Sequence, residues 1–176
     1  MRGSLLVVTG PPGAGKSTVA TAIAQRREPS VLVEGDAFFG FLQRGAIDPW
    51  LPESNDQNTV VTNAAGAATG RFVEGGMHVV YDGVIGSWSL DEFLTSTGLD
   101  HLAYVVLLPS IATCVHRVAA RVGHGFKDES AARDMHDQFA TRGGDPRHVI
   151  ADSADSVEAL ARRVMTAMDA GELRYP

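Results

Sequence analysis

The stretch Gly10-Pro11-Pro12-Gly13-Ala14-Gly15-Lys16-Ser17, followed by Thr18, decides the fold of this chain. It fits the pattern G-x-x-x-x-G-K-[ST], in which glycines let the backbone curl so that successive N–H groups point inward at an anion. At this spacing Lys16 reaches the outer phosphates of a nucleotide, and the Ser17 hydroxyl ligates Mg²⁺. Every residue from Gly10 to Thr18 is therefore a candidate nucleotide-binding residue, Lys16 is also a catalytic candidate, and Ser17 is also a candidate metal ligand.

The residues on both sides of the loop supply the structure that the pattern requires. The preceding run, Ser4-Leu5-Leu6-Val7-Val8-Thr9, is short, apolar and β-branched, which indicates a buried strand. After the loop, Val19, Ala20, Ile23 and Ala24 recur at helical spacing, and such a helix directs the positive end of its dipole at the same anion. This order favours a phosphate-binding loop over a chance glycine-rich turn.

Length and composition narrow the class of protein. The chain has 176 residues, of which 44% are hydrophobic, and this predicts a single domain over residues 1–176 with a sizeable core. A net charge of −6 without a basic stripe argues against a nucleic-acid partner. No apolar run approaches the roughly 20 residues of a membrane span, and a core strand begins almost at the N-terminus, so we expect no membrane partner, no signal peptide and a cytoplasmic location. The single cysteine, Cys114, is interpreted as part of the core.

A second apolar run, Ser30-Val31-Leu32-Val33, ends at Glu34-Gly35-Asp36. In an open parallel sheet, ligands bind outside the carboxyl ends of the strands, which places both acidic residues at the ligand edge. Asp36 is our candidate catalytic base, because a carboxylate there orients an acceptor hydroxyl and takes its proton during phosphoryl transfer. Two alternatives stay open: Asp36 only caps the next helix, or Glu34 is the base.

Later strands bring further acidic residues to the same edge. Met77-His78-Val79-Val80-Tyr81 is followed by Asp82, which either supports the Mg²⁺ shell or faces the acceptor. A fourth strand is predicted over Leu102 to Leu108, and a short fifth one over His148 to Ala151. Asp152 follows that fifth strand and is a candidate contact for the nucleotide base.

Aromatic residues cluster after Asp36. Phe38, Phe39, Phe41 and Trp50 lie in a segment that Pro49 and several glycines interrupt. This composition is typical of a wall of a small-molecule pocket, and equally of side chains that pack under a loop.

Two arginines, Arg117 and Arg121, lie four residues apart and so share one face of a predicted helix. They lead into Gly123-His124-Gly125-Phe126-Lys127, a flexible basic stretch. We predict a lid at about 122–130, with both arginines catalytic through charge neutralisation and Arg117 also contacting the nucleotide. The alternative is a solvated helix face, and which arginine is catalytic stays open. Asp155 and Glu158 have capping-box spacing for a last helix.

Taken together, these motifs resemble a small P-loop kinase of the adenylate/shikimate/gluconate-kinase type over essentially the whole length. The resemblance implies a three-layer α/β fold with a five-stranded parallel sheet in the order 2-3-1-4-5, flanking helices and a short lid, and it implies ATP and Mg²⁺ as cofactors.

Arg121-Val122-Gly123-His124-Gly125-Phe126 with Gln138-Phe139 is similar to the lid of gluconate kinases, as are Glu34-Gly35-Asp36 and Pro49-Trp50-Leu51. Gluconate kinases have a His where this chain has Phe38 and Phe39, and a different stretch in place of Tyr81-Asp82-Gly83-Val84-Ile85. The chain also resembles chloramphenicol phosphotransferase and the AAA-type ATPase-like small kinases, a resemblance that again makes Asp36 the base.

The sequence thus predicts an ATP-dependent phosphotransferase that acts on a hydroxyl of a small molecule, with a sugar acid, a nucleoside and an antibiotic all open as acceptors. The alternative is a nucleotide-binding regulator or slow ATPase without an acceptor. The aromatic segment between Phe38 and Leu51 favours the first interpretation.

Overall fold

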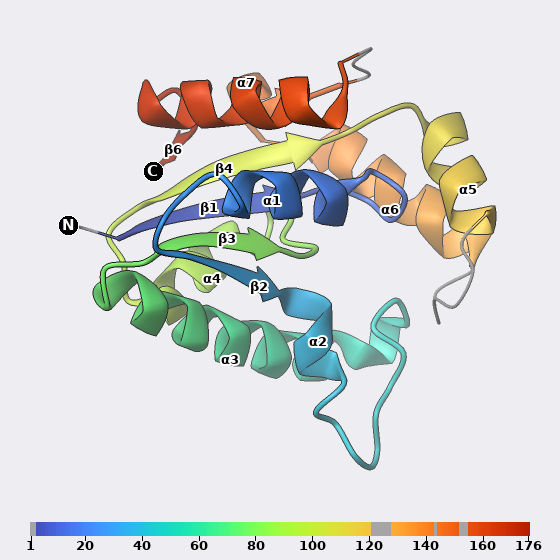
Figure 1. Ribbon diagram of the computed structural model, residues 1–176. Helices are drawn as coiled ribbons and strands as arrows, with labels where there is room; N and C mark the ends of the chain where they lie inside the picture. Colours follow the sequence, from blue (N-terminus) through green and yellow to red (C-terminus); the bar gives the residue numbers. More distant parts are fainter. Residues whose placement is uncertain (1–2, 121–127, 143, 152–154) are drawn as a thin grey trace.

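A computed structural model describes residues 3–120, 128–142, 144–151 and 155–176, and shows a parallel β-sheet between two layers of helices (Figure 1). The strands are β1 (Ser4–Thr9), β2 (Ser30–Glu34), β3 (His78–Asp82), β4 (Leu102–Leu107), β5 (Val149–Ile150) and β6 (Arg174–Tyr175). The parallel strands follow the order β2-β3-β1-β4-β5, which confirms the predicted order. The sequence analysis did not predict β6, a two-residue strand that pairs antiparallel with β4.

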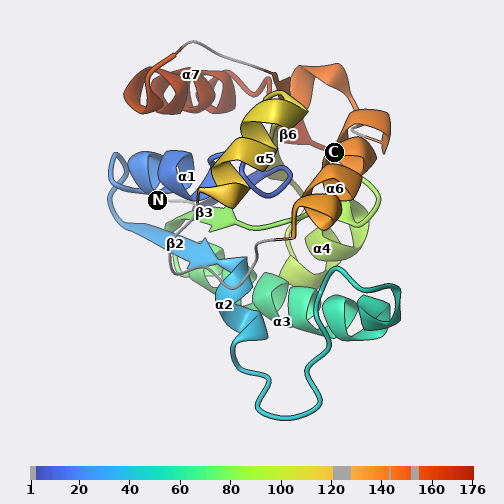
Figure 2. The same cartoon turned by 90° about the vertical axis from the view of Figure 1, so that its right-hand side faces the viewer.

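The helices cover both faces of the sheet and its carboxyl edge. They are α1 (Lys16–Ala24), α2 (Gly35–Phe39), α3 (Asn55–Glu74), α4 (Leu90–Thr97), α5 (Ile111–Ala119), α6 (Glu129–Arg142) and α7 (Val157–Asp169), with short 3-10 turns at Pro52–Ser54 and Pro146–His148. Helices α1 and α7 lie on one face, and α3 and α4 on the other (Figure 1). Figure 2 looks onto the carboxyl edge of the sheet, where α2, α5 and α6 surround the loop between β1 and α1.

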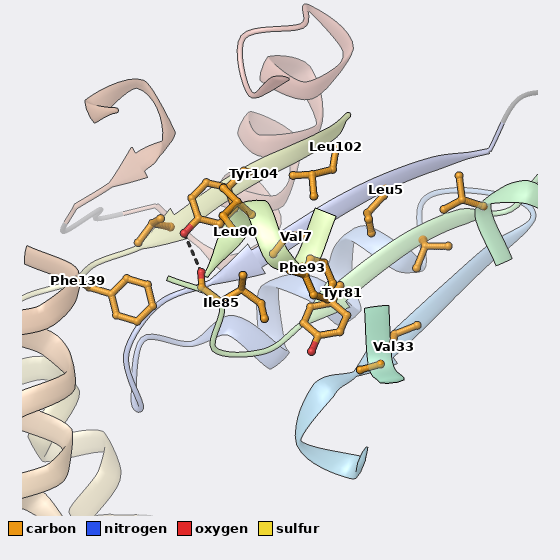
Figure 3. Close-up of a cluster of buried hydrophobic side chains, with 14 residues drawn as sticks. Leu5, Val7, Val33, Tyr81, Ile85, Leu90, Phe93, Leu102, Tyr104 and Phe139 are labelled. Atoms are coloured by element: carbon orange, nitrogen blue, oxygen red, sulfur yellow. Dashed lines mark hydrogen bonds between the residues drawn. The ribbon is translucent and has the colours of Figure 1, made fainter. Parts of the chain in front are cut away.

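Strand alternation divides the core in two, because successive side chains of a strand point to opposite faces. In β1, Leu5 and Val7 belong to the cluster under α3 and α4, whereas Leu6 and Val8 belong to the cluster under α1 and α7. Figure 3 shows the first cluster, in which Phe93 of α4 packs against the β-strand side chains. Burial on both faces explains why β1 and β4 appear in the sequence as continuous apolar runs.

One detail of the last helix differs from the sequence-based expectation. The N-cap of α7 is Ser156, whose hydroxyl accepts a hydrogen bond from the Ala159 N–H, so the predicted capping box of Asp155 and Glu158 is wrong by one residue. Ser156 can cap the helix because it precedes Ala159 by three residues, and the Ala159 N–H in the first turn has no partner within the helix. Among the described residues, no helix combines the length and the apolar character that crossing a bilayer requires.

Candidate nucleotide and acceptor site

The loop between β1 and α1 takes a conformation that its glycines make accessible. Gly13 and Gly15 have φ angles of 81° and 93°, values that favour glycine over every other residue. At Gly13 a Cβ atom would also lie 2.3 Å from the carbonyl oxygen of Cys114, so α5 packs directly on the loop. Gly15 is the N-cap of α1, and the helix therefore begins at Lys16 with its free N–H groups toward the loop.

Lys16 and Ser17 extend the loop toward the end of β3. The Lys16 ammonium donates a hydrogen bond to the Pro11 carbonyl over 3.1 Å, which holds it across the loop. The Ser17 hydroxyl lies close enough to the Asp82 carboxylate to lower its pKa, and both residues line one cavity. The two predicted metal-site residues thus lie side by side, and an ammonium group is close enough to interact with both the loop and the carboxylate.

Asp82 is an unusual carboxylate, because only 8% of its surface is exposed. Burial raises its pKa, and the charges of Asp36 and Glu34 raise it further, whereas the Ser17 hydrogen bond and the Lys16 charge lower it. Its Oδ1 atom is buried without a hydrogen-bond partner in the described structure. A hydroxyl beside a carboxylate oxygen that has no hydrogen-bond partner fits Mg²⁺. This ion takes few protein ligands and leaves its other positions to phosphates and water. Accordingly, the described residues contain no cluster of three or more His, Cys, Asp or Glu suited to a metal.

Asp36 and the phosphate loop meet at one cavity of about 320 Å³. Lys16, Ser17 and Asp82 line this cavity together with Asp36. Asp36 is in the first turn of α2, whose N-cap is Glu34, so Asp36 is not the N-cap of that helix. Glu34 is exposed at the end of β2 and is not among the described residues that line this cavity.

The aromatic segment divides between the two roles considered for it. Phe39 and Trp50 line the cavity that contains Asp36. Phe38 instead packs against the core cluster under α3. Phe41, which is 70% exposed, has its ring 5.4 Å from that of Phe38 in an edge-on arrangement.

A second cavity, of about 450 Å³, lies on the other side of the loop. Thr18, Arg117 and Asp155 line it together with Ala151 at the end of β5. The Arg117 guanidinium donates hydrogen bonds to the carbonyl oxygens of Gly13 and Ala14, at 3.3 and 3.4 Å. The structure therefore brings Arg117 to the loop itself, at a cavity that Asp36 does not line.

Several predicted residues lie outside the described ranges. Arg121, Asp152 and the lid residues 122–127 are among them. Of the predicted lid, residues 128–130 are described: Asp128 accepts a hydrogen bond from the Ala131 N–H at the start of α6.

The chain matches the AAA_33 family, described as an AAA domain, over residues 5–146. This chain belongs to the AAA_33 family. No match was found among curated protein sequences.

Solved structures share the AAA_33 fold of this chain. A sugar kinase from Janibacter sp. HTCC2649 is 20% identical, with a TM-score of 0.69 over 94% of each chain. A gluconokinase from Sinorhizobium meliloti 1021 is 25% identical, with a TM-score of 0.62 over 96% of this chain and 93% of that one. A chain of an RNA repair complex is 21% identical, with a TM-score of 0.63 over 80% of this chain and 45% of that one. The expected resemblance to small P-loop kinases is confirmed.

The AAA_33 domain also places residues at the site that the sequence analysis did not assign to it. The Thr9 hydroxyl, at the end of β1, accepts a hydrogen bond of 2.9 Å from the Ile85 N–H and so ties the loop after β3 to the start of the phosphate loop. Asn58 and Thr62 of α3 and Met135 of α6 line the cavity of Asp36. The spacing of Asn58 and Thr62, four residues apart, marks one helix face, but only the packing of α3 shows which way that face points.

Proposed function

We propose that this AAA_33 domain is an ATP-dependent phosphotransferase that moves the γ-phosphate of ATP to a hydroxyl of a small molecule. The observation that carries the proposal is that Lys16, Ser17, Asp36 and Asp82 line one cavity. The N–H groups of the loop and Lys16 hold the phosphates, and Arg117 holds the nucleotide from the other cavity. Arg121 is proposed to close over the phosphates with the lid, and Asp152 to contact the base.

Ser17 and Asp82 are proposed to hold Mg²⁺, Ser17 directly and Asp82 through the ion's water shell. When bound, the ion would offset the negative charge that develops on the phosphates. Asp36 accepts the proton of the acceptor hydroxyl as that oxygen attacks phosphorus in line with the departing ADP oxygen. The proton moves to the Asp36 carboxylate, the new O–P bond forms, and the bond to ADP breaks.

The charges of the cavity support an alcohol as the acceptor group. A phosphate or carboxylate acceptor entering this space would meet Asp36 and Asp82, and among the described lining residues the only cation is Lys16, which the ATP phosphates engage. A neutral hydroxyl meets no such repulsion and donates its proton to a carboxylate.

The space beyond Asp36 supports a small molecule larger than water. A further cavity of about 550 Å³ is adjacent to the cavity of Asp36, because both are lined by Pro49, Asn58, Thr62, Val84 and Met135. Glu92 also lines this further cavity. Its negative charge, together with the chain's net charge of −6, argues against an RNA acceptor, since nucleic-acid sites attract phosphates with basic side chains.

The test is ADP release from MgATP, alone and with D-glucose, D-gluconate, shikimate, uridine and an RNA oligonucleotide with a free 5′-hydroxyl. Acceleration by one of the four small compounds, with a phosphorylated product in mass spectrometry, supports the proposal. Equal hydrolysis under every condition favours the regulator or slow ATPase, and acceleration by RNA alone overturns the small-molecule assignment.

The matched variants for that assay are Asp36→Asn and Glu34→Gln. Removing the proposed base should abolish transfer and leave ATP binding within about threefold of the wild type, because Asp36 does not line the cavity proposed to hold the nucleotide with Arg117. Glu34→Gln changes an exposed carboxylate at the end of β2 and should retain activity. The reverse result would make Glu34 the base.

A further inference from the structure

Tyr81 brings a neutral hydroxyl group to the cavity of Asp36. The residue precedes Asp82 in β3, and its ring packs on Phe93 with the ring centroids 4.7 Å apart. Only 3% of the residue is exposed, yet it lines the cavity that Lys16, Ser17 and Asp36 form. In Figure 3 the Tyr81 hydroxyl points away from the apolar cluster in which the ring is packed.

Two glycines make room for this hydroxyl. A Cβ atom on Gly35 would lie 2.4 Å from Tyr81 Oη, and one on Gly83 would lie 2.6 Å from a ring carbon. Gly35 is the residue directly before Asp36. The missing side chain therefore lets the phenol hydroxyl approach the backbone that carries the proposed base.

The second large tyrosine of the same cluster behaves differently. Tyr104 is equally buried, but its hydroxyl donates a hydrogen bond of 2.8 Å to the Ile85 carbonyl, as the dashed line in Figure 3 shows. Among the described residues, none forms a hydrogen bond with Tyr81 Oη. Tyr81 Oη is not among the fully buried polar atoms of the described residues that lack a partner, so this hydroxyl is accessible from the cavity that Tyr81 lines.

Resting on the function proposed above, we infer that Tyr81 is an acceptor-positioning residue, whose phenol hydroxyl donates a hydrogen bond to the acceptor oxygen that Asp36 deprotonates. The pairing selects an alcohol. An alcohol hydroxyl donates one hydrogen bond to the Asp36 carboxylate and accepts one from the phenol through a lone pair. Because both contacts meet at one atom, they fix which hydroxyl of a polyol faces the γ-phosphate.

A phenol is a hydrogen-bond donor at neutral pH, because its ordinary pKa is about 10. A retained proton is what a donor to the acceptor oxygen requires. As this oxygen attacks phosphorus it loses its own proton to Asp36, while the phenol proton stays on Tyr81 and holds the oxygen in line.

The test compares Tyr81→Phe with Tyr104→Phe, two single-oxygen deletions in one core cluster. The acceptor is the compound of the five-member panel that most accelerates ADP release, or water if none does. Tyr81→Phe should lower kcat/KM for the acceptor about threefold to tenfold, the range of one neutral hydrogen bond. With an organic acceptor it should also yield more than one phosphorylated regioisomer of a polyol, while KM for ATP and Tm stay unchanged.

Tyr104→Phe should give the opposite pattern, with a Tm lowered by several degrees and unchanged kinetics, because the Ile85 carbonyl loses its partner. Unchanged acceptor kinetics and a single regioisomer in Tyr81→Phe would overturn the inference. A rise in KM for ATP as large as the fall in kcat/KM for the acceptor would also overturn it. Failure of the proposed function itself is read separately, in the wild-type protein, as ADP release that no acceptor accelerates.

Discussion

The Ser17 hydroxyl lies beside the Asp82 carboxylate and lowers its pKa, so the first turn of α1 meets the carboxyl end of β3 at one cavity. The sheet register supports the same junction, since Asp82 is paired with Val8 of β1 only two residues before Gly10. A loop held by a strand on one side and a buried carboxylate on the other needs little reorganisation when charge arrives. Such preorganisation is the main source of electrostatic stabilisation in phosphoryl transfer.

The buried carboxylate should reduce stability while serving the site. Because the pKa of Asp82 is raised in the folded protein, its folded state holds a proton more tightly than its unfolded state. This contribution to stability is therefore present at low pH and is lost as pH rises through the folded pKa. Asp82→Asn should raise Tm at pH 7 and weaken the decline of stability with rising pH, as measured by thermal unfolding between pH 4 and 8.

The same variant should need more Mg²⁺ for activity, because an amide oxygen is a weaker partner for the ion's water shell than a carboxylate. A Mg²⁺ titration of ADP release measures this shift. Asp48→Asn, which changes an exposed carboxylate, serves as the control and should leave both Tm and the Mg²⁺ requirement unchanged. A destabilised Asp82→Asn protein with a normal Mg²⁺ requirement would show that Asp82 has a structural role instead.

Lys16→Ala should lower kcat about 10²–10³-fold, the loss found when one preorganised donor to a transition-state charge is removed. The ammonium is hydrogen-bonded across the loop to the Pro11 carbonyl, and the proposed function has its charge stabilise the transferred phosphate. Steady-state and single-turnover ADP release measure the loss. The control is Arg71→Ala, which removes an exposed cation of α3 that pairs only with Glu74 among the described residues. Near-normal turnover in Lys16→Ala would overturn the phosphotransfer proposal as a whole.

The layers of this fold could be predicted from sequence because their signals are local. The apolar run from Ser4 to Thr9 and the glycines after it indicate a strand followed by a phosphate-binding loop. The family resemblance that they support predicted the strand order correctly. The sequence also indicated that Asp36 and Asp82 share an edge, because connectivity puts the carboxyl ends of parallel strands together.

What could not be predicted depends on side-chain direction and on long-range packing. Tyr81 looked like an ordinary strand residue, since nothing local shows that Gly35 and Gly83 leave space for its hydroxyl. The division of Phe38 from Phe39 was open for the same reason: adjacent residues of a short helix face different surroundings, and only the position of α2 decides between them. The strand β6 is too short to leave a periodic signal.

Arg117→Ala should raise KM for ATP while leaving KM for the acceptor unchanged. The guanidinium hydrogen-bonds the carbonyl oxygens of Gly13 and Ala14 and lines the cavity on the Thr18 side, not the cavity of Asp36. Removing these contacts should loosen the loop and weaken nucleotide binding about tenfold, the effect of one or two hydrogen bonds to a charged group. Kinetics with each substrate varied in turn separate the two constants. A rise confined to the acceptor constant would place Arg117 on the acceptor side.

His148 should make folding stability sensitive to acid. It is buried between the rings of Tyr104 and Tyr175, with Nε2 unpartnered among the described residues. Burial lowers its pKa and the Arg147 charge lowers it further, although a backbone hydrogen bond at Arg174 and the charge of Asp145 oppose this. Below about pH 6.5 the unfolded chain therefore takes up a proton at His148 more readily than the folded protein does, and stability falls as pH falls.

The measurement is urea unfolding at pH 7.5, 6.5 and 5.5 for the wild type, His148→Phe and the exposed control His101→Gln. Phe fills the space between the two tyrosine rings and does not titrate, so His148→Phe should lose less stability than the wild type between pH 6.5 and 5.5. His101→Gln should follow the wild type, because it removes an exposed imidazole and leaves His148 in place. An equal decline in His148→Phe and the wild type would assign the acid sensitivity to other groups.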